Sequence, residues 1–389
     1  MKRLVLHIGC PKCASSTLQG YLTQNPVLPL DGSKDGFLRY VAATAAPNII
    51  QGDTAMRAAL VGNAYGYVNC LPETLTEKAR FASALLQIER ISGPNDIVVL
   101  SCENWGFFNV VTPDFHDIIN SINVPVDVFM LTRPPVDWVN SAWWQWGTWL
   151  EDDKKEDGLD HLQSINLLQL FNKWADIERV SQVSVHDISQ GPIESFLAFV
   201  GASQAAPPPT ARLNVATDYD LLRHMIRNKL HYQRDHSVTL IEFRLNQIIE
   251  FQRKALPSIM SRPMAEKLIS RDQDDNRILI DLLQKNAVAP LAKEVVRRYL
   301  DPTAYDHLPE TIDFAENFGA NYSDDFVRAI IDALLKLEQQ ATETALLSAG
   351  ISNFDPVRYL ELNPDVGASG MNPFEHFFRF GFKESRRLL

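Results

Sequence analysis

The sequence predicts a three-layer α/β/α protein, with a central parallel sheet between two layers of helices and a small helical module at the C-terminus. Short segments that are apolar on both faces, such as 126–131, alternate with segments of helical period. Strands buried on both faces are typical of parallel sheets covered by helices. Residues 351–389 change character and are rich in aromatic side chains, which indicates a separate module.

Hydrophobic periodicity predicts the individual elements in chain order. The expected strands are 2–8, 97–101, 126–131 and 183–186, and the expected helices are 15–24, 77–91, 115–123, 136–149, 165–177 and 193–200. Residues 31–76 have weak periodicity, and loops with short helices are expected there. After the stiff spacer Ala-Ala-Pro-Pro-Pro at 205–209, residues 219–300 are expected to be mostly helical. The predicted domains are an α/β domain over 1–300, a helical connector over 301–350 and the module over 351–389.

Composition limits the possible partners. The 389 residues are 46% hydrophobic and 22% charged, as in ordinary globular proteins. A formal net charge of -11 gives no overall attraction for nucleic acid or an anionic membrane, so an anionic ligand needs a local cluster of donors. We expect no secretory signal and no membrane span. With only four cysteines, free thiols and a cytoplasmic location are expected.

The loop after the first strand carries residues suited to an anion. Residues 7–19 are His-Ile-Gly-Cys-Pro-Lys-Cys-Ala-Ser-Ser-Thr-Leu-Gln. Lys12 supplies a positive charge, and the N–H groups at the start of the following helix attract negative charge. Ser15, Ser16 and Thr17 add hydroxyl donors. The alternative is that these three hydroxyl residues are only helix N-caps.

The loop differs from the GxxxxGK[ST] loop of nucleoside triphosphatases, in which a hydroxyl beside the lysine binds magnesium. Cys13 follows Lys12 here, which favours anion transfer without a metal ion, and a kinase-like phosphotransferase stays an alternative. Cys10 and Cys13 also form a CxxC pair that would suit a thioredoxin-like redox protein. A zinc site is less well supported, because Cys70 and Cys102 form no second CxxC.

A second candidate anion site follows the expected strand 126–131. Arg133 stands at the carboxyl end of this strand, where open α/β sheets bind ligands. Ser141 lies about two turns into the next expected helix. A guanidinium and a hydroxyl on the same side suit a terminal phosphate. The alternative is an arginine that caps a loop and a serine at a helix contact.

Together, the two motifs resemble those of the PAPS-dependent sulfotransferases, where PAPS is 3′-phosphoadenylyl sulfate. Bacterial and glycan-modifying members carry an early H-I-G-x-x-K-[TC]-[GA]-[ST]-[ST]-x-L-Q segment, which residues 7–19 match closely. They also carry an arginine with a serine eight positions later, as at Arg133 and Ser141. The resemblance covers about residues 1–290 in order of elements, with a weaker similarity at Asp275-Asn276. A redox protein has no reason to carry the second motif.

The resemblance implies a P-loop-like fold and a donor site that grips the 5′-phosphosulfate with the loop and the 3′-phosphate with Arg133 and Ser141. PAPS would be the co-substrate and PAP, 3′,5′-ADP, the product, with no metal ion. The implied binding residues are Gly9, Lys12, Cys13, Ala14, Ser15, Ser16, Thr17, Arg133 and Ser141. Ala14 departs from the glycine of many members, and alanine can serve only if φ stays negative there.

Glu103 is the predicted general base, because the acceptor must lose a proton during sulfuryl transfer. It follows the expected strand 97–101 at the same sheet edge as the loop, and glycan sulfotransferases resemble this chain in that placement. Lys12 would stabilise the charge that develops on the leaving group. The alternative for Glu103 is a turn cap. His7, His116 and His161 are less well placed to act as the base.

Five tryptophans lie between Trp138 and Trp149, and they cannot all share one helix face. Some are therefore expected to be exposed or to cover a groove, where they could stack on a sugar acceptor. The C-terminal segment resembles a bacterial FDPxxYLxxNPDV…PxxHYxxxGxxEGR module that accompanies surface-glycan proteins, although Ser385 replaces the usual glycine. The association of such modules with surface-glycan proteins suggests that the acceptor is a glycan or polysaccharide. A non-catalytic glycan-assembly binding protein is the other alternative.

Overall fold

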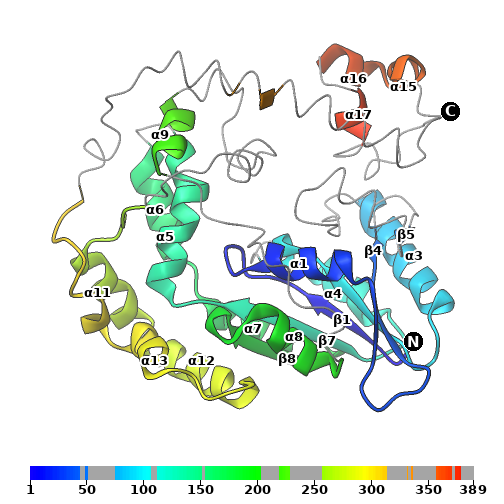
Figure 1. The fold of residues 1–389 in the computed structure, drawn as a ribbon, viewed down its shortest axis with the longest axis horizontal. Coiled ribbons are helices and arrows are strands. Elements are labelled where there is room, and N and C mark those ends of the chain that lie inside the picture. The colour runs from blue at the N-terminus through cyan, green and yellow to red at the C-terminus, as the bar shows by residue number, and fades with distance from the viewer. Residues whose placement is uncertain are drawn as a thin grey trace.

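The computed structural model describes residues 1–43, 49–50, 75–106, 112–150, 154–202, 219–227, 256–312, 331, 334–335, 356–369 and 373–377. Within them the chain is an α/β protein with a mostly parallel six-stranded sheet (Figure 1). The strands are β1 (Arg3–His7), β2 (Val27–Pro29), β3 (Phe37–Tyr40), β6 (Ile97–Ser101), β7 (Val126–Thr132) and β8 (Val180–Asp187).

The spatial order of the sheet is β2-β3-β6-β1-β7-β8, with only the edge pair β2 and β3 antiparallel. A separate two-stranded pairing joins β4 (Ala42–Ala43) to β5 (Ile49–Ile50). From β1 the chain passes through α1 to the edge strand β2 and returns to β3 on one side, and from β6 it crosses past β1 to β7 on the other. The chain therefore leaves the neighbouring strands β1 and β6 toward opposite edges of the sheet. In open α/β sheets, ligands bind beside the carboxyl ends of two such strands.

Helices cover both faces of the sheet. On one face, α1 (Ser15–Gln24) packs against α8 (Pro192–Val200), and Phe129 of β7 meets Phe196 of α8 at 5.1 Å between ring centroids. On the other face, Trp105 contacts Phe81 and Phe115, and Phe115 contacts Trp174. These contacts join α3 (Leu75–Ile91), the 3-10 turn η1 (Glu103–Gly106), α4 (Pro113–Asn120) and α7 (Leu167–Ala175).

Most elements confirm the expected positions. The predicted bounds of α1 and β6 match those observed, and the other predicted strands and helices of the first 200 residues differ by a few residues at their ends. The sequence missed β2 and α6 (Lys155–Gln163), and the strands β3, β4 and β5 lie in the segment 31–76, where loops and short helices are predicted. The expected helix 136–149 is divided into α5 (Pro135–Gln145) and η2 (Gly147–Trp149). At Gly147 the chain passes so close to the Trp143 ring that a Cβ would lie 2.1 Å from it.

The later part is helical where it is described. It contains α9 (Tyr219–Arg227), α11 (Arg262–Arg271), α12 (Gln273–Asn286) and α13 (Lys293–Leu300). α12 packs on β8 and α7, and α11 contacts α5, so these helices extend the layer that begins with α7 (Figure 1). The spacer 205–209 and the body of the predicted connector helix lie outside the described residues. None of the helices in the described ranges combines the length and apolar character needed to cross a membrane.

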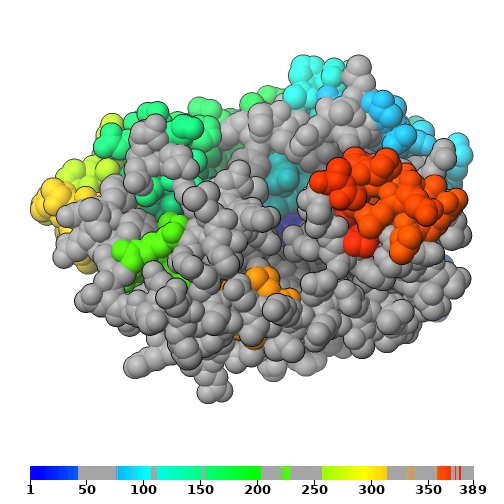
Figure 2. All heavy atoms as spheres, turned by 90° about the horizontal axis from the view of Figure 1, so that it is seen from above, coloured from blue at the N-terminus to red at the C-terminus, as the bar shows by residue number. Residues whose placement is uncertain are grey.

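The C-terminal segment forms a compact unit of three short helices. They are α15 (Pro356–Leu362), α16 (Pro364–Ser369) and α17 (Pro373–His376). Tyr359, Val366 and Phe377 are buried between them, and the hydroxyl of Tyr359 lies 3.0 Å from Nδ1 of His376. Both views place the unit on the outside of the molecule, at the end that carries α3 (Figures 1 and 2). The helical module predicted from its aromatic residues is therefore present.

Candidate functional site

The segments that follow β1 and β6 bring the loop and the predicted base together. The backbone N–H of Lys12 donates to Oε1 of Glu103 at 3.0 Å. Gly9 permits this approach, because a Cβ there would lie 3.0 Å from both Cα of Glu103 and Oγ of Ser15. Its φ of 70° is also one that glycine adopts at least cost. The loop after β1 and Glu103 are thus in direct contact, and we treat them as one candidate site.

The loop backbone contradicts one expectation. Ala14 has a φ of 64°, although a negative value is expected if alanine is to serve in place of glycine there. Lys12, with a φ of 67°, is the other non-glycine residue with positive φ among the described residues. Left-handed backbone costs an L-residue roughly 1–2 kcal/mol, so surrounding contacts must hold the loop in this form.

The three hydroxyl residues are not helix caps. Ala14 is the N-cap of α1 and offers no side-chain cap, whereas Ser15, Ser16 and Thr17 occupy the first turn. The cap alternative is therefore wrong. Oγ of Ser15 is buried and has no hydrogen-bond partner among the described residues. Because a buried hydroxyl without a partner is costly, this oxygen is available to a ligand at the positive end of α1.

Arg133 directly follows β7, so it lies at the same sheet edge as the loop. Its Nε is buried without a hydrogen-bond partner, and none of the described acidic side chains forms an ion pair with it. The nearby carboxylate of Asp137 already bonds Arg298 of α13. Ser141 is half-buried on α5, two turns beyond Arg133. Arg133 therefore lies between β7 and α5, and Ser141 lies on α5, which are the positions that the sequence predicts relative to these two elements.

Glu103 is partly enclosed at the start of η1. Burial raises the pKa of its carboxyl, and this is the largest influence; the Lys12 amide and the Lys12 charge act in the opposite direction. A carboxylate that takes up a proton more readily than usual suits a general base. The histidine competitors lie elsewhere. His7 is buried against Ser101, with a pKa lowered to about 3 by burial, and His116 and His161 are on α4 and α6.

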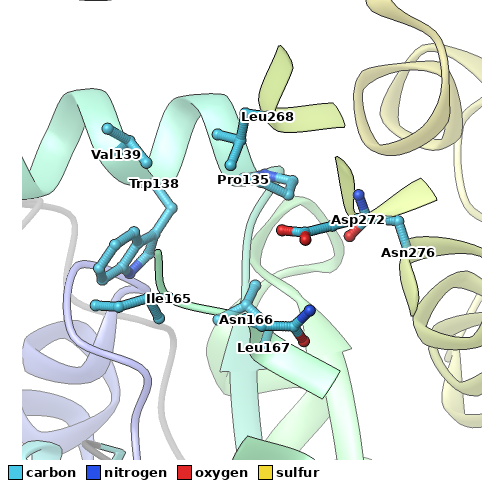
Figure 3. Close-up of a pocket in the computed structure, with 9 residues that line it drawn as sticks. All are labelled: Pro135, Trp138, Val139, Ile165, Asn166, Leu167, Leu268, Asp272 and Asn276. Atoms are coloured by element: carbon cyan, nitrogen blue, oxygen red, sulfur yellow. The ribbon is translucent and has the colours of Figure 1, made fainter. Parts of the chain in front are cut away.

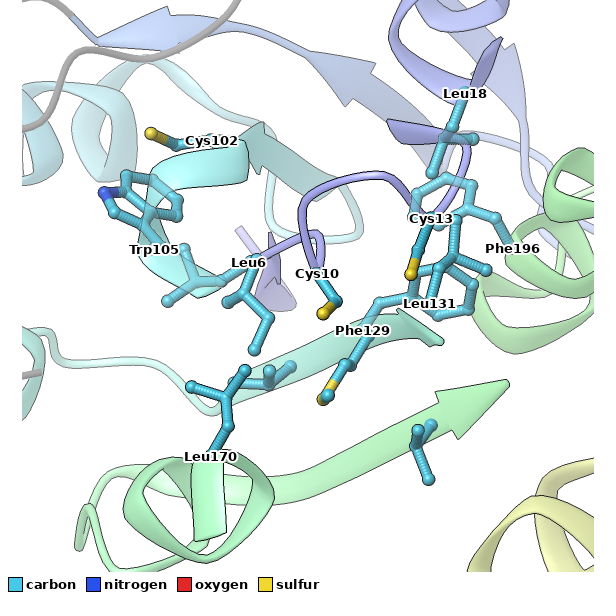
Figure 4. Packing of buried hydrophobic residues seen from close by; sticks show 14 of the residues in the cluster. Leu6, Cys10, Cys13, Leu18, Cys102, Trp105, Phe129, Leu131, Leu170 and Phe196 are labelled. Atoms are coloured by element: carbon cyan, nitrogen blue, oxygen red, sulfur yellow. The ribbon is translucent and has the colours of Figure 1, made fainter. Parts of the chain in front are cut away.

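Both loop cysteines point into the hydrophobic core (Figure 4). Cys10 and Cys13 are at most 1% exposed. The hydrogen bond to the Cys13 thiol and burial raise the pKa of Cys10 well above its usual value. A redox-active CxxC pair needs an accessible thiolate, so this environment weighs against the thioredoxin-like alternative.

The tryptophan cluster is buried, which corrects the expectation of an exposed stacking surface. Trp138, Trp143, Trp144 and Trp149 are at most 3% exposed, and only Trp146 is half-buried. They share the interior because α5 ends at Gln145 and the chain then turns. Two indole N–H groups donate to backbone: Trp138 to the Pro11 carbonyl at 2.7 Å and Trp144 to the Pro257 carbonyl at 2.8 Å.

A narrow pocket lies beside this site, between the starts of α5, α7 and α12 (Figure 3). Trp138 forms one wall, and Asp272 and Asn276 supply polar groups. Nδ2 of Asn276 is buried without a partner among the described residues. Neither the residues of the loop nor Glu103, Arg133 or Ser141 line this pocket, so sequence reasoning missed it. The only signal was the weak similarity at Asp275-Asn276.

Comparisons with protein-family models, curated proteins and solved structures gave no match to this chain. In the part of the chain that the structure describes, no cluster of three or more His, Cys, Asp or Glu side chains is arranged to hold a metal ion. Functional inference therefore depends on the geometry of the site.

Proposed function

We propose that this chain is a sulfotransferase with a P-loop-like fold. It would move a sulfuryl group from PAPS to a hydroxyl or amine of an acceptor, which we propose to be a glycan or polysaccharide. The observation that carries the proposal is the 3.0 Å hydrogen bond between the Lys12 amide and Glu103. It puts a proton acceptor directly beside a loop suited to anions.

The residues present fit a donor with anionic groups at two positions. One group of donors consists of Lys12, the buried Ser15 hydroxyl without a partner and the positive end of α1. The other is Arg133, whose guanidinium has a buried Nε without a partner. PAPS carries a 5′-phosphosulfate and a 3′-phosphate, so each group of donors has an anion to bind. PAP would leave with both phosphates.

The reaction needs a proton acceptor and stabilisation of a leaving group. Glu103 takes the proton from the acceptor O–H or N–H as that oxygen or nitrogen bonds to sulfur. The sulfur–oxygen bond to the 5′-phosphate breaks, and its electron pair stays on the phosphate oxygen. Lys12 and the loop amides stabilise the negative charge that develops there. The loop holds the reacting groups together, which lowers the entropic barrier.

The test is titration calorimetry of 3′,5′-ADP without magnesium, on wild type and on Arg133→Ala. Loss of a charge-assisted contact should weaken binding about 10- to 100-fold. Arg358→Ala is the matched control, because it removes an exposed arginine of α15 that forms an ion pair with Glu361, three residues along the same helix. Its affinity should equal that of wild type.

Each other outcome points to a different function. Absence of 3′,5′-ADP binding in wild type would overturn the proposal. Magnesium-dependent binding of ATP in preference to 3′,5′-ADP would favour the kinase-like alternative. If glycan binding survives in a Glu103→Gln variant and no sulfate transfer occurs in wild type, a non-catalytic binding protein becomes the better interpretation.

A further inference from the structure

One peptide unit of the loop is held at both ends by side chains from two different parts of the sheet edge. The N–H of the Pro11–Lys12 peptide donates to Glu103, which follows β6, at 3.0 Å. The C=O of the same peptide accepts from Nε1 of Trp138, on the helix that follows β7, at 2.7 Å. In a trans peptide the two groups point in opposite directions, so the loop is held from both sides.

The orientation of this peptide restrains the conformation of Lys12. The φ angle of Lys12 is the rotation about its N–Cα bond, so it is measured relative to the plane of the Pro11–Lys12 peptide. Lys12 has a φ of 67°, which an L-residue leaves readily unless contacts oppose the change. Trp138 is 3% exposed, and a hydrogen bond without competing water is a strong restraint. The bond to Pro11 therefore resists rotation of the peptide toward a relaxed form.

Trp138 also connects the two motifs. It lies three residues before Ser141 on α5, so the two side chains are neighbours on one face of the helix. Arg133 stands just before the same helix. A bond from Trp138 to the loop thus fixes the distance between the loop and the segment that carries Arg133 and Ser141.

We infer that Trp138 is a positioning residue, which holds the Pro11–Lys12 peptide and thereby sets the loop at a fixed separation from Arg133 and Ser141. It acts through the loop and not by touching the ligand. The identity of the ligand, a nucleotide with 5′- and 3′-phosphates, depends on the proposed function; the restraint on the loop does not.

The chain contains a matched control. Trp144 lies on the same helix, is also 3% exposed and donates its indole N–H to another proline carbonyl, that of Pro257, at 2.8 Å. Trp138→Phe and Trp144→Phe each remove one buried N–H donor and a similar ring area. Only the first variant releases the loop.

The first measurement is amide hydrogen exchange over residues 8–18 in the absence of ligand. Loss of one hydrogen bond should accelerate exchange at Lys12 and Cys13 about three- to tenfold in Trp138→Phe, with wild-type rates in Trp144→Phe. Equal rates in all three proteins would overturn the inference. Thermal melting checks that both variants are folded. If Trp138→Phe does not fold, benzothienylalanine at position 138 keeps the ring size and removes only the N–H.

The second measurement compares two nucleotides on each variant. Trp138→Phe should weaken binding of adenosine 5′-monophosphate about three- to tenfold and leave adenosine 3′-monophosphate within about twofold of wild type. Equal loss for both nucleotides would indicate general destabilisation and overturn the positioning role. If wild type binds neither nucleotide, the proposed function fails, and the exchange result still decides whether Trp138 restrains the loop.

Discussion

The loop after β1 and the C-terminal module differ in how completely their polar groups are hydrogen-bonded within the described chain. In the module, the Tyr359 hydroxyl bonds His376, and the Asn363 amide bonds the Tyr359 carbonyl at 2.8 Å. At this edge of the sheet, Lys12 and Ala14 have positive φ, and buried polar atoms of Ser15 and Arg133 have no partner among the described residues. Strained backbone and buried polar groups without partners are common features of ligand sites. We therefore expect substitutions in the two regions to have different effects.

The largest effect is expected at Glu103. Glu103→Gln keeps an oxygen that can accept from the Lys12 amide but removes the base, so sulfate transfer should fall by about 10²- to 10⁴-fold. Affinity for 3′,5′-ADP should change little. Glu103→Ala should lose turnover and also loosen the loop, seen as faster exchange at Lys12. Retained turnover in Glu103→Gln would show that Glu103 only supports the loop.

The same residue gives a pH dependence. Because burial raises the pKa of Glu103, the base should be protonated, and activity lost, at a higher pH than for an ordinary glutamate. The folded state holds this proton more tightly than the unfolded state, so the residue favours folding in acid and opposes it as pH rises through the folded-state pKa. Glu103→Gln should therefore be more stable than wild type at neutral pH, with a difference that shrinks in acid. Denaturant unfolding at several pH values measures it.

Gly9→Ala should be the most destabilising small change in the loop after β1. Its φ of 70° is unfavourable for alanine, and a Cβ would contact Glu103 and Ser15 at 3.0 Å. We expect a loss of about 2–4 kcal/mol in the free energy of unfolding. Gly201, with the same φ but nothing within 4 Å of a Cβ, is the control, and Gly201→Ala should cost only about 1–2 kcal/mol. Equal losses in denaturant unfolding would contradict the close packing at Gly9.

Tyr359→Phe tests the module by removing its internal hydrogen bond to His376. The module should lose about 1 kcal/mol of local stability, visible as faster amide exchange in residues 356–369. Binding of 3′,5′-ADP should be unaltered. Altered nucleotide affinity would show that the module and the loop region are energetically coupled. It would contradict our expectation that substitutions in the two regions have different effects.

Ala14→Gly should give the smallest effect, and in the opposite direction. Glycine adopts a φ of 64° without the penalty that alanine bears, and part of that gain is offset by the greater freedom of glycine in the unfolded chain. We expect a net stabilisation of about 0.5–1 kcal/mol in denaturant unfolding. Destabilisation would mean that Ala14 does not have positive φ in solution.

The local pattern was enough to predict much of the framework. Hydrophobic runs predicted β6 and β7, and Gly9 and Lys12 marked the loop between β1 and α1 as a candidate anion site. The position of Glu103 after β6 and of Arg133 after β7 sufficed to predict that both lie at the loop's sheet edge. Periodicity and strand ends carry this information, because each depends on neighbours in the chain.

Tertiary structure decided what neighbours in the chain cannot determine. The Pro11–Lys12 peptide, next to the positive φ of Lys12, is held by hydrogen bonds with Glu103 and Trp138, which are distant in sequence. The tryptophan cluster is buried by contacts that the local sequence does not show, such as the bond from Trp144 to the Pro257 carbonyl. The sequence by itself thus determined the elements and the chemistry available at their ends. Long-range packing determined which buried polar groups find a hydrogen-bond partner among the described residues, because burial depends on how distant segments meet.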